Sequence, residues 1–251
     1  MTPPGAERGL WGGKLLLFDT LPSTNQWVLD NIHSLHHGDV VRALRQTAGR
    51  GRFQRQWVTP GDRCLTFSVL LQYTRNDQWL APVTGQAAAL AVRLAIENHQ
   101  IPAMLKWPND VLIRGKKVAG ILAERHADGG VVLGVGLNVN LPAAELAAID
   151  LIHPATSMRI ETGSDFDIDV LAADVFQSLE AAIDRARRRG MSGILDAWKP
   201  HDALAGKRIS VQAAGLTATG TYAGLAPDGR LRLVDDEGRE HLFWAGDASL
   251  R

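Results

Sequence analysis

Three arginines in one short segment are the side chains of this chain best suited to bind an anion. Residues 46–57 read Gln-Thr-Ala-Gly-Arg-Gly-Arg-Phe-Gln-Arg-Gln-Trp, so Arg50, Arg52 and Arg55 lie among glycines and before a tryptophan. A planar guanidinium matches the paired oxygens of phosphate or carboxylate, and glycine lets the backbone come close to a ligand. The segment therefore predicts a flexible cationic loop that closes over an anion such as a nucleotide. The alternative is a solvated basic surface loop, which the glycines on both sides of Arg50 make less favoured.

Interior glycines are the second feature that points to a ligand. Gly120, Gly134 and Gly136 fall inside apolar runs that read as neighbouring strands of a meander. Glycine weakens a strand and often marks the close approach of a ligand or of another backbone segment. Together these glycines predict a floor without side chains beneath a flat small molecule. A bulge or tight strand–helix packing would explain any one of them alone.

A helix start supplies further polar groups. Ser23 with Gln26 three residues later fits a capping box, in which serine accepts from a backbone N–H and glutamine reaches back. A helix N-terminus also offers unpaired N–H groups and a partial positive charge to a polar ligand group. We therefore expect both a structural and a binding role for this turn.

Apolar runs and helical periodicity predict the elements that position these residues. Strands are expected at 15–18, 40–44, 65–71, 104–107 (resumed at 111–113), 118–124 and 131–140, with a turn at 128–130, and helices at 23–33, 82–100, 169–189 and 194–198. After Pro200, short strands at 209–212, 218–222, 231–234 and 241–244 alternate with Asp-Gly and Glu-Gly turns. We therefore predict a catalytic domain over 1–202 and a small β-barrel domain over 203–251.

The bulk properties are those of an ordinary globular protein. The 251 residues carry a formal net charge of zero, which gives no support for a nucleic-acid partner. The single cysteine, Cys64, cannot form an intramolecular disulfide, and the N-terminus has no apolar signal core. We see no stretch long enough to span a membrane and expect a cytoplasmic protein. The arginines at 185–189 are interpreted as capping and solvation of a helix C-terminus, not as a nucleic-acid patch.

Several segments together resemble the biotin protein ligases, also called biotin–acetyl-CoA-carboxylase ligases. They are the arginine loop, Lys-Trp-Pro-Asn-Asp at 106–110, Lys-Val-Ala-Gly-Ile-Leu at 117–122, Ser-Thr-Asn at 23–25 and Gly-Val-Gly-Leu-Asn at 134–138. The resemblance runs from about residue 15 to the C-terminus. It implies an α+β fold, a class II synthetase-like central mixed sheet flanked by helices, followed by an SH3-like β-barrel. Little sequence precedes the first predicted strand, so the chain resembles the short form without a DNA-binding domain.

The resemblance also implies a reaction in two steps. Biotin and ATP, with Mg²⁺ as the activating ion, give biotinyl-5′-AMP and pyrophosphate. The ε-amine of a lysine on the biotin carboxyl carrier domain of acetyl-CoA carboxylase then displaces AMP. The first step brings two anions together, so catalysis must be mostly positioning and positive charge. No nucleic acid or membrane partner is implied, no protein ligand for the metal is assigned, and both a monomer and a homodimer remain open.

Roles for single residues are carried over from the same resemblance. Lys117 bridges the biotin carboxylate and the α-phosphate, Arg50 and its neighbours hold the reactive product, and Asp110 orients Lys117 or accepts a proton. The implied biotin-binding residues are Ser23, Thr24, Asn25, Gln46, Gly49, Arg50, Arg52, Lys117, Gly120, Leu122, Gly134 and Gly136. The implied nucleotide-binding residues are Arg52, Arg55, Trp57 over the adenine, Lys106, Asn109, Asn138 and Arg251. Gln54 departs from the family, which often has glycine there.

Two alternative functions remain. Lipoate or octanoate ligases share the catalytic fold and the acyl-adenylate chemistry, although the Gly-Arg-Gly-Arg loop and the terminal barrel favour biotin. A protein that binds biotinyl-AMP without transferring it is less favoured, because Lys117 and the loop arginines are all present. Biotin-dependent pyrophosphate exchange discriminates the latter, since a pure binder would show none.

Overall fold

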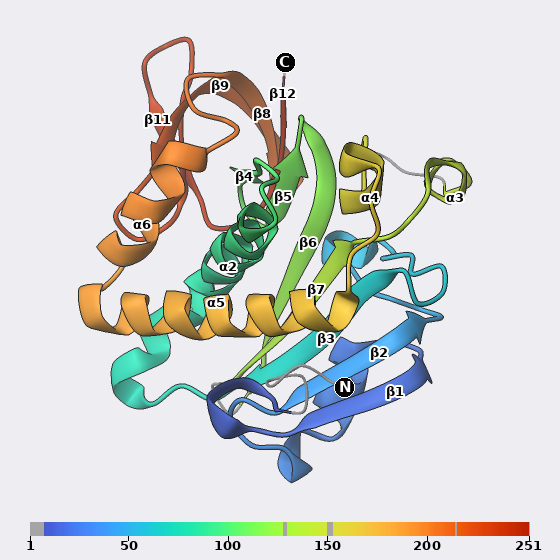
Figure 1. The fold of residues 1–251 in the computed structure, drawn as a ribbon. Coiled ribbons are helices and arrows are strands. Elements are labelled where there is room, and N and C mark those ends of the chain that lie inside the picture. Colours follow the sequence, from blue (N-terminus) through green and yellow to red (C-terminus); the bar gives the residue numbers. More distant parts are fainter. Residues whose placement is uncertain (1–7, 128–129, 150–152, 214, 251) are drawn as a thin grey trace.

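A seven-stranded mixed sheet forms the centre of the molecule (Figure 1). The computed structural model describes residues 8–127, 130–149, 153–213 and 215–250. The strand order is β1-β2-β3-β7-β6-β5-β4, and only the β1–β2 pair is parallel. The strands are β1 Leu15–Leu21, β2 Val40–Gln46, β3 Cys64–Leu71, β4 Met104–Lys106, β5 Asp110–Ile113, β6 Lys116–Arg125 and β7 Val131–Asn138. The mixed sheet expected from the sequence is confirmed.

Helices cover both faces of this sheet. Alternating side chains of β3 point to opposite faces, so Val69 joins the main core while Leu70 packs with Val28 of α1. The helices α2 and α5 lie on the main-core face, where Phe176 of α5 packs edge-on against Phe67. The α-helices are α1 Thr24–Asp30, α2 Thr84–Asn98, α3 Ala143–Ala147, α4 Met158–Thr162, α5 Ile168–Arg189 and α6 Ser192–Trp198. The 3₁₀ helices are η1 Leu10–Gly12, η2 Ile32–Ser34, η3 Arg52–Gln54, η4 Arg75–Val83 and η5 Lys199–His201.

The segment around Pro108 corrects one prediction. The sequence predicted a single strand that resumes after Pro-Asn-Asp, but β4 and β5 are two antiparallel strands of a hairpin. Lys106 pairs with Asp110 across it, and the Trp107–Pro108 peptide bond in the turn is cis. The turn therefore reverses the chain and directs Asn109 and Asp110 toward β6. The turn predicted at 128–130 falls largely outside the described residues.

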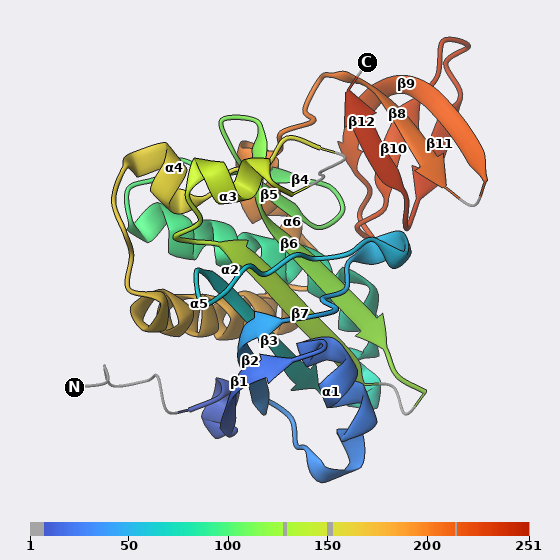
Figure 2. The ribbon, with the colours of Figure 1, turned by 90° about the vertical axis from the view of Figure 1, so that its right-hand side faces the viewer.

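The C-terminal strands form a second, antiparallel sheet at one end of the molecule (Figures 1 and 2). Its order is β11-β10-β9-β8-β12, with β8 Arg208–Ala213, β9 Leu216–Leu225, β10 Leu231–Val234, β11 Glu240–Phe243 and β12 Asp247–Leu250. The sequence analysis did not predict β12. The buried residues of this sheet are continuous with the main core, and Asp202 accepts a hydrogen bond from Tyr222 at the joint. The small sheet is therefore seated on the larger unit through buried contacts.

The helical stretch from Arg75 to Asn98 corrects the expectation that no stretch of the chain is long enough to span a membrane. By length and composition it is apolar enough to cross a bilayer, although the sequence analysis found no such segment. Its most apolar window is 78% buried within the protein. The apolar side chains of α2, apart from the exposed Leu94, therefore face the core, in agreement with the buried helix predicted for this region.

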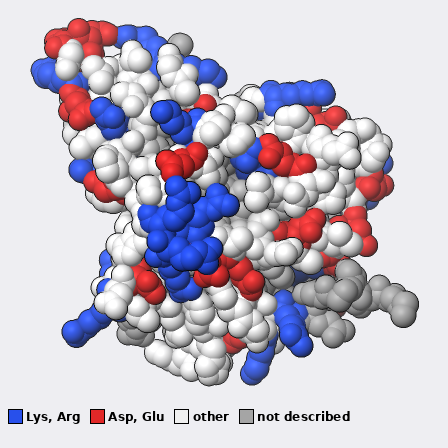
Figure 3. Space-filling view, turned by 60° about the vertical axis from the view of Figure 1, so that its left-hand side comes forward, with Lys and Arg blue, Asp and Glu red and all other residues white. Residues whose placement is uncertain are grey.

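The arginines at the end of α5 are partly ion-paired. Arg187 lies near Asp77 and Asp184 and over the ring of Trp11, and Arg189 pairs with Asp196 at 3.0 Å. Figure 3, which brings this side of the molecule forward, shows Lys and Arg side chains gathered in a patch with acidic side chains beside it. Cations at a helix C-terminus also complement the helix dipole. These contacts place Arg187 and Arg189 beside carboxylates, and the interpretation as capping and solvation stays a prediction.

Candidate functional site

A cleft with a cavity of about 300 Å³ lies between the main sheet, the arginine loop and the small sheet. Its lining includes nearly all of the residues singled out from the sequence: Ser23, Thr24, Asn25, Gln46, Arg50, Arg52, Arg55, Trp57, Lys106, Asn109, Asp110, Lys117, Gly120, Leu122, Gly134, Gly136 and Asn138. Gly49 is not among the lining residues, but its carbonyl accepts the Trp57 backbone N–H at 2.9 Å. Arg251 lies outside the described residues.

Register places the glycines side by side on the floor of the cleft. Gly120 of β6 pairs with Gly136 of β7, and Leu122 pairs with Gly134. A Cβ on Gly136 would lie 2.3 Å from Trp57 Cε2, and one on Gly120 would lie 3.2 Å from Trp57 Cζ3. The indole of Trp57 therefore rests on the floor formed by Gly120 and Gly136. Its Nε1 is buried and has no hydrogen-bond partner among the residues that the structure describes.

Lys117 and Asp110 form an ion pair on the cleft wall. Lys117 Nζ lies 2.6 Å from Asp110 Oδ1 and 5.9 Å from the centre of the Trp57 ring. A register shift between β5 and β6 occurs just beside these residues. The backbone of Lys117 is fixed as well, because its N–H donates to Pro154 at 2.9 Å and its carbonyl accepts from Thr156 at 2.8 Å. The fold therefore holds an ammonium group at a defined point of the cleft.

Polar groups gather where α1 begins. Ser23 caps the helix by accepting from the Gln26 N–H, as predicted. The Gln26 side chain does not reach back, which corrects the second half of the capping box, because it bonds Asp30 and Arg50 instead. Gln46 Oε1 accepts from the Thr24 N–H at 2.8 Å and from its hydroxyl at 3.1 Å. This end of the cleft is therefore lined by neutral hydrogen-bonding groups.

Asn25 extends this polar end beneath the cleft. A Cβ on Gly134 would lie 2.1 Å from Asn25 Oδ1, so the missing side chain there makes room for the Asn25 amide. The sequence analysis missed Ser68. Its Oγ lies 2.5 Å from Asn25 Oδ1 and 2.7 Å from Thr24 Oγ1. The position of Ser68 opposite Asn25 follows from the register of β3 and had no signal in the local sequence.

The arginine loop runs from the main sheet toward the small one (Figure 2), and its residues line the cleft. Arg50 pairs with Glu124 at 2.6 Å on β6. Arg52 donates to Asn109 Oδ1 at 3.3 Å and to the Gly246 carbonyl at 3.1 Å. Burial lowers the pKa of Arg52, an effect that the nearby Asp110 and Asp247 carboxylates oppose. The loop is thus held at both ends, with Arg52 enclosed inside the cleft.

Asp247, at the start of β12, is the main site residue that the sequence analysis missed. It is ion-paired with Arg55, and His153 Nε2 lies 3.6 Å from the same carboxylate oxygen. Burial raises the pKa of Asp247, but the hydrogen bond from Arg55 and the nearby cations outweigh it and hold the pKa below its ordinary value. No local pattern marks an aspartate in a C-terminal strand as a partner of an arginine so far away in the chain.

The two asparagines assigned to the nucleotide mainly fix backbone. Asn109 Nδ2 donates to the Ile121 carbonyl at 2.5 Å, and Asn138 Nδ2 donates to the Thr156 carbonyl at 3.0 Å. Lys106 lines the same end of the cleft. Within the described residues, no group of three His, Cys, Asp or Glu side chains is arranged to hold a metal ion. The site therefore offers several cations and amide groups to an anionic ligand.

Comparison with known proteins gives a consistent set of relatives. The model of the biotin/lipoate A/B protein ligase family matches residues 17–141. A biotin–[acetyl-CoA-carboxylase] ligase of Paracoccus denitrificans is 33% identical over 87% of this chain and 93% of its own length. One from Mycobacterium tuberculosis is 34% identical over 84% of this chain and 78% of its own length. Among solved structures, a biotin protein ligase from Aquifex aeolicus in complex with biotin and ATP superposes with a TM-score of 0.77, at 27% identity, over 94% of this chain and 98% of that chain.

Proposed function

The chain belongs to the biotin protein ligases of the biotin/lipoate protein ligase family, and on that premise we propose that its cleft makes and then transfers an activated biotin. In the first step a biotin carboxylate oxygen attacks the α-phosphorus of ATP, and pyrophosphate leaves. In the second, the ε-amine of a carrier-domain lysine attacks the biotinyl carbonyl, and AMP leaves while the amine loses a proton. The protein is a ligase that consumes ATP to biotinylate a carboxyl carrier protein.

The observation that carries this proposal is the Lys117 ammonium group beside the floor that the glycines form. It stands 2.6 Å from Asp110 and next to Gly120 in the cleft. A fixed cation offsets the repulsion between a carboxylate and a phosphate, and it costs little reorganisation because the fold already holds it. We assign Lys117 to bridging these two anions. Asp110 orients Lys117, and it is the carboxylate suited to accept the proton of the incoming lysine.

Biotin is assigned to the neutral end of the cleft. Thr24, Asn25 and Gln46 supply donors and acceptors for the ureido group, and the glycine floor receives the fused rings. The indole of Trp57 rests on that floor. Entry of biotin therefore has to displace Trp57, which then becomes available to cover the adenine. The unpaired indole N–H supports this assignment, because a buried donor without a partner is unfavourable.

The arginines divide between the two ends of the loop. Arg52 lies inside the cleft near Asn109, while Arg50 pairs with Glu124 at the outer wall. We therefore assign retention of the adenylate mainly to Arg52, and we give Arg55 to the outer phosphates. The sequence analysis had placed retention on Arg50 and its neighbours. Mg²⁺ would enter with ATP, whose phosphates usually supply part of its coordination, and no protein ligand is assigned to it.

The partner is a biotin carboxyl carrier domain, and we assign the reaction to the cytoplasm without a nucleic-acid or membrane partner. We further propose that residues 1–202 carry the catalysis. Residues 203–251 form an SH3-like unit whose strand β12 closes the nucleotide end through Asp247.

An assay with biotin and lipoate in parallel tests this function. Purified protein with ATP, Mg²⁺ and biotin should label a biotin carboxyl carrier domain, and lipoate should label a lipoyl domain far less. Biotin-dependent exchange of labelled pyrophosphate into ATP should accompany the first reaction. Transfer of lipoate without biotin would overturn the substrate assignment. Biotin binding without pyrophosphate exchange would overturn the enzymatic one.

A further inference from the structure

One carboxylate touches both the polar end of the cleft and the arginine loop. Glu124 lies near the end of β6 and is not among the residues assigned above to biotin or ATP. Its Oε2 accepts from Asn25 Nδ2 at 2.8 Å, and its Oε1 accepts from Arg50 Nη2 at 2.6 Å. Each oxygen therefore has a partner from a different element, one from helix α1 and one from the loop.

On the inner side, Glu124 completes the fixation of Asn25. The amide of Asn25 fits over Gly134, its oxygen lies 2.5 Å from Ser68 Oγ, and its nitrogen donates to Glu124. Asn25 is 4% exposed, so a displacement of its amide would have to break these contacts together. The orientation of Asn25 and the position of Glu124 therefore depend on each other.

On the outer side, Glu124 fixes the base of a small hairpin within the loop. Arg50 pairs with Gln56 across an antiparallel bridge, and the Gly51 N–H donates to the Arg55 carbonyl at 2.7 Å. Trp57 follows directly, with its own N–H on the Gly49 carbonyl. Holding Arg50 thus positions the strand that carries Arg55 and Trp57. The contacts run without a gap from Asn25 through Glu124 to the residues over the cleft.

We propose that Glu124 is a positioning residue that couples biotin binding to the closure of the arginine loop over ATP, through one carboxylate shared by Asn25 and Arg50. The inference rests on the proposed function. Biotin that fixes the Asn25 amide also fixes Glu124, which then holds Arg50 and the hairpin ready for the nucleotide. Hydrogen bonds between a carboxylate and a guanidinium are stronger than neutral ones, so the charge of Glu124 is required for the outer contact.

The test is a binding cycle on the full chain. The Kd of a non-hydrolysable ATP analogue is measured with and without saturating biotin in the wild type, in Glu124→Gln and in Asp236→Asn. Wild-type protein should bind the analogue roughly five-fold or more tightly when biotin is present, the lower range of common coupling between sites. In Glu124→Gln this enhancement should fall to within about two-fold of unity, because one amide oxygen cannot serve both donors.

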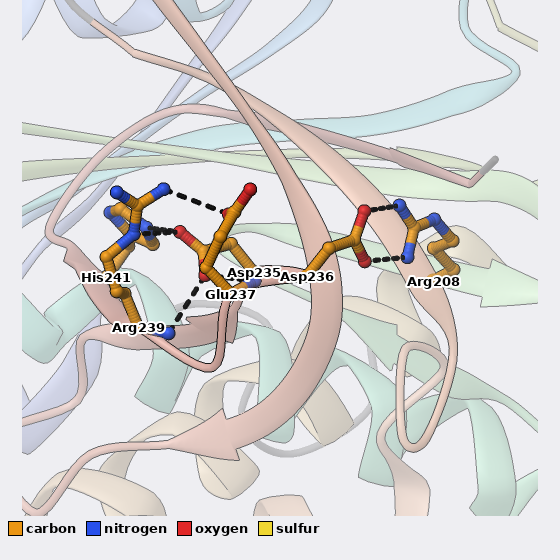
Figure 4. A network of polar contacts seen from close by, with 6 residues as sticks. All are labelled: Arg208, Asp235, Asp236, Glu237, Arg239 and His241. Carbon is orange, nitrogen blue, oxygen red and sulfur yellow. Dashed lines mark hydrogen bonds and ion pairs between the residues drawn. The ribbon is translucent and has the colours of Figure 1, made fainter.

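Asp236→Asn is the matched control, because it breaks an Arg–carboxylate pair with Arg208 on the small sheet, outside the cleft (Figure 4). It should keep the wild-type enhancement. Arg50→Ala should lose the enhancement like Glu124→Gln, and adding Glu124→Gln to it should change little more, because both remove the same contact. Arg50→Ala also carries the test if Glu124→Gln does not fold.

The inference is overturned if biotin tightens binding of the ATP analogue equally in the wild type and in Glu124→Gln. It is also overturned if the effects of Glu124→Gln and Arg50→Ala on this enhancement are additive. A wild type that binds biotin and transfers it, but shows no enhancement, overturns the inference and leaves the proposed function standing. A wild type that does not bind biotin contradicts the proposed function instead.

Discussion

Two arginine-rich regions of this protein use the same kind of contact in opposite ways. In the small sheet, Arg239 binds Asp235 four residues away, His241 binds the same aspartate, and Arg208 forms a two-point contact with Asp236 (Figure 4). In the cleft, Arg50 pairs with Glu124, 74 residues away, and Arg55 pairs with Asp247, 192 residues away. Apart from Arg208, which reaches the turn from β8, the first network closes the turn between β10 and β11, and the second ties separate parts of the fold together.

The two networks differ in whether a ligand anion can take the place of the carboxylates that bind the arginines. The aspartates of the small sheet are supplied by the turn that they stabilise, so they and the arginines form together. The loop arginines form ion pairs with carboxylates on β6 and β12. A ligand phosphate or carboxylate offers the same paired oxygens. Ion pairs near the surface contribute little stability, so the Arg55–Asp247 pair can be exchanged for a phosphate at small cost, whereas Glu124 keeps Arg50 in place. The outer part of the cleft network is therefore suited to switch partners, and the turn network is suited to stay as it is.

The largest effect expected in the cleft is that of Lys117→Ala. Adenylate formation should fall by about 100-fold or more, since Lys117 is the ammonium group that pairs with Asp110 in the cleft and offsets the repulsion of the two anions. Biotin-dependent pyrophosphate exchange measures this step. Lys116→Ala is the matched control, because the next residue carries the same charge and lies 3.7 Å from Glu161 instead. Near-normal exchange in Lys117→Ala would refute the role of Lys117.

The second effect separates the two arginines of the loop. Arg52→Ala should speed dissociation of biotinyl-AMP by about ten- to hundred-fold, the loss expected for hydrogen bonds from a charged group inside a cleft. Arg50→Ala should have the smaller effect, because its guanidinium lies at the outer wall on Glu124. Stopped-flow displacement of the adenylate gives both rates. The opposite order would return retention to Arg50, as the sequence alone had assigned it.

A third experiment weakens the contact between the loop and the small sheet. Asp247→Asn removes the charge that Arg55 binds, so trypsin should cut the ligand-free loop up to about five-fold faster. Cleavage sites are identified by mass spectrometry. Asp236→Asn removes an equivalent charge from the turn network and should leave the cutting rate unchanged. Equal rates in wild type and Asp247→Asn would show that Asp247 does not hold the loop.

The smallest effect is the response of the two networks to acid. A hydrogen bond from Arg55 holds the pKa of Asp247 below its ordinary value of 3.8. A hydrogen bond from His241 does the same for Asp235. In both cases burial acts in the opposite direction. A carboxyl with a lowered native pKa stabilises the native state fully above the unfolded pKa, and this contribution is lost as pH falls through the native pKa. Both contacts should therefore remain intact at about pH 5.

Titration of the carboxyl groups by NMR checks this expectation. Both midpoints should lie below 3.8 in the wild type. In Arg55→Ala the midpoint of Asp247 should rise, because burial is then less opposed, while that of Asp235 should not move. A midpoint of Asp247 that is unaffected by Arg55→Ala would contradict the assignment of Arg55 as its partner.

The central elements followed from local pattern alone. Helical spacing predicted α2 and α5, and apolar runs predicted β2, β3, β6 and β7, because burial on one or two faces leaves a periodic trace. The hairpin of β4 and β5 was read as one interrupted strand, since a short apolar run gives no direction. The Gln26 side chain was assigned to a capping box, but the nearby Arg50 and Asp30 provide charged partners for it.

By itself, the sequence determined which chemistry was possible. Its glycines and its arginine loop predicted a site for an anion, because those residue types suit phosphate and carboxylate in any arrangement, and the resemblance of its motifs to biotin protein ligases implied the acyl adenylate and the role of Lys117. Only the tertiary structure decided which carboxylate each arginine binds and what fills the glycine floor. Glu124 and Asp247 reach the loop because strand register and the seating of the small sheet bring them there. The distances from these two carboxylates to the loop arginines depend on the whole packed fold, so no local pattern of residues predicts them.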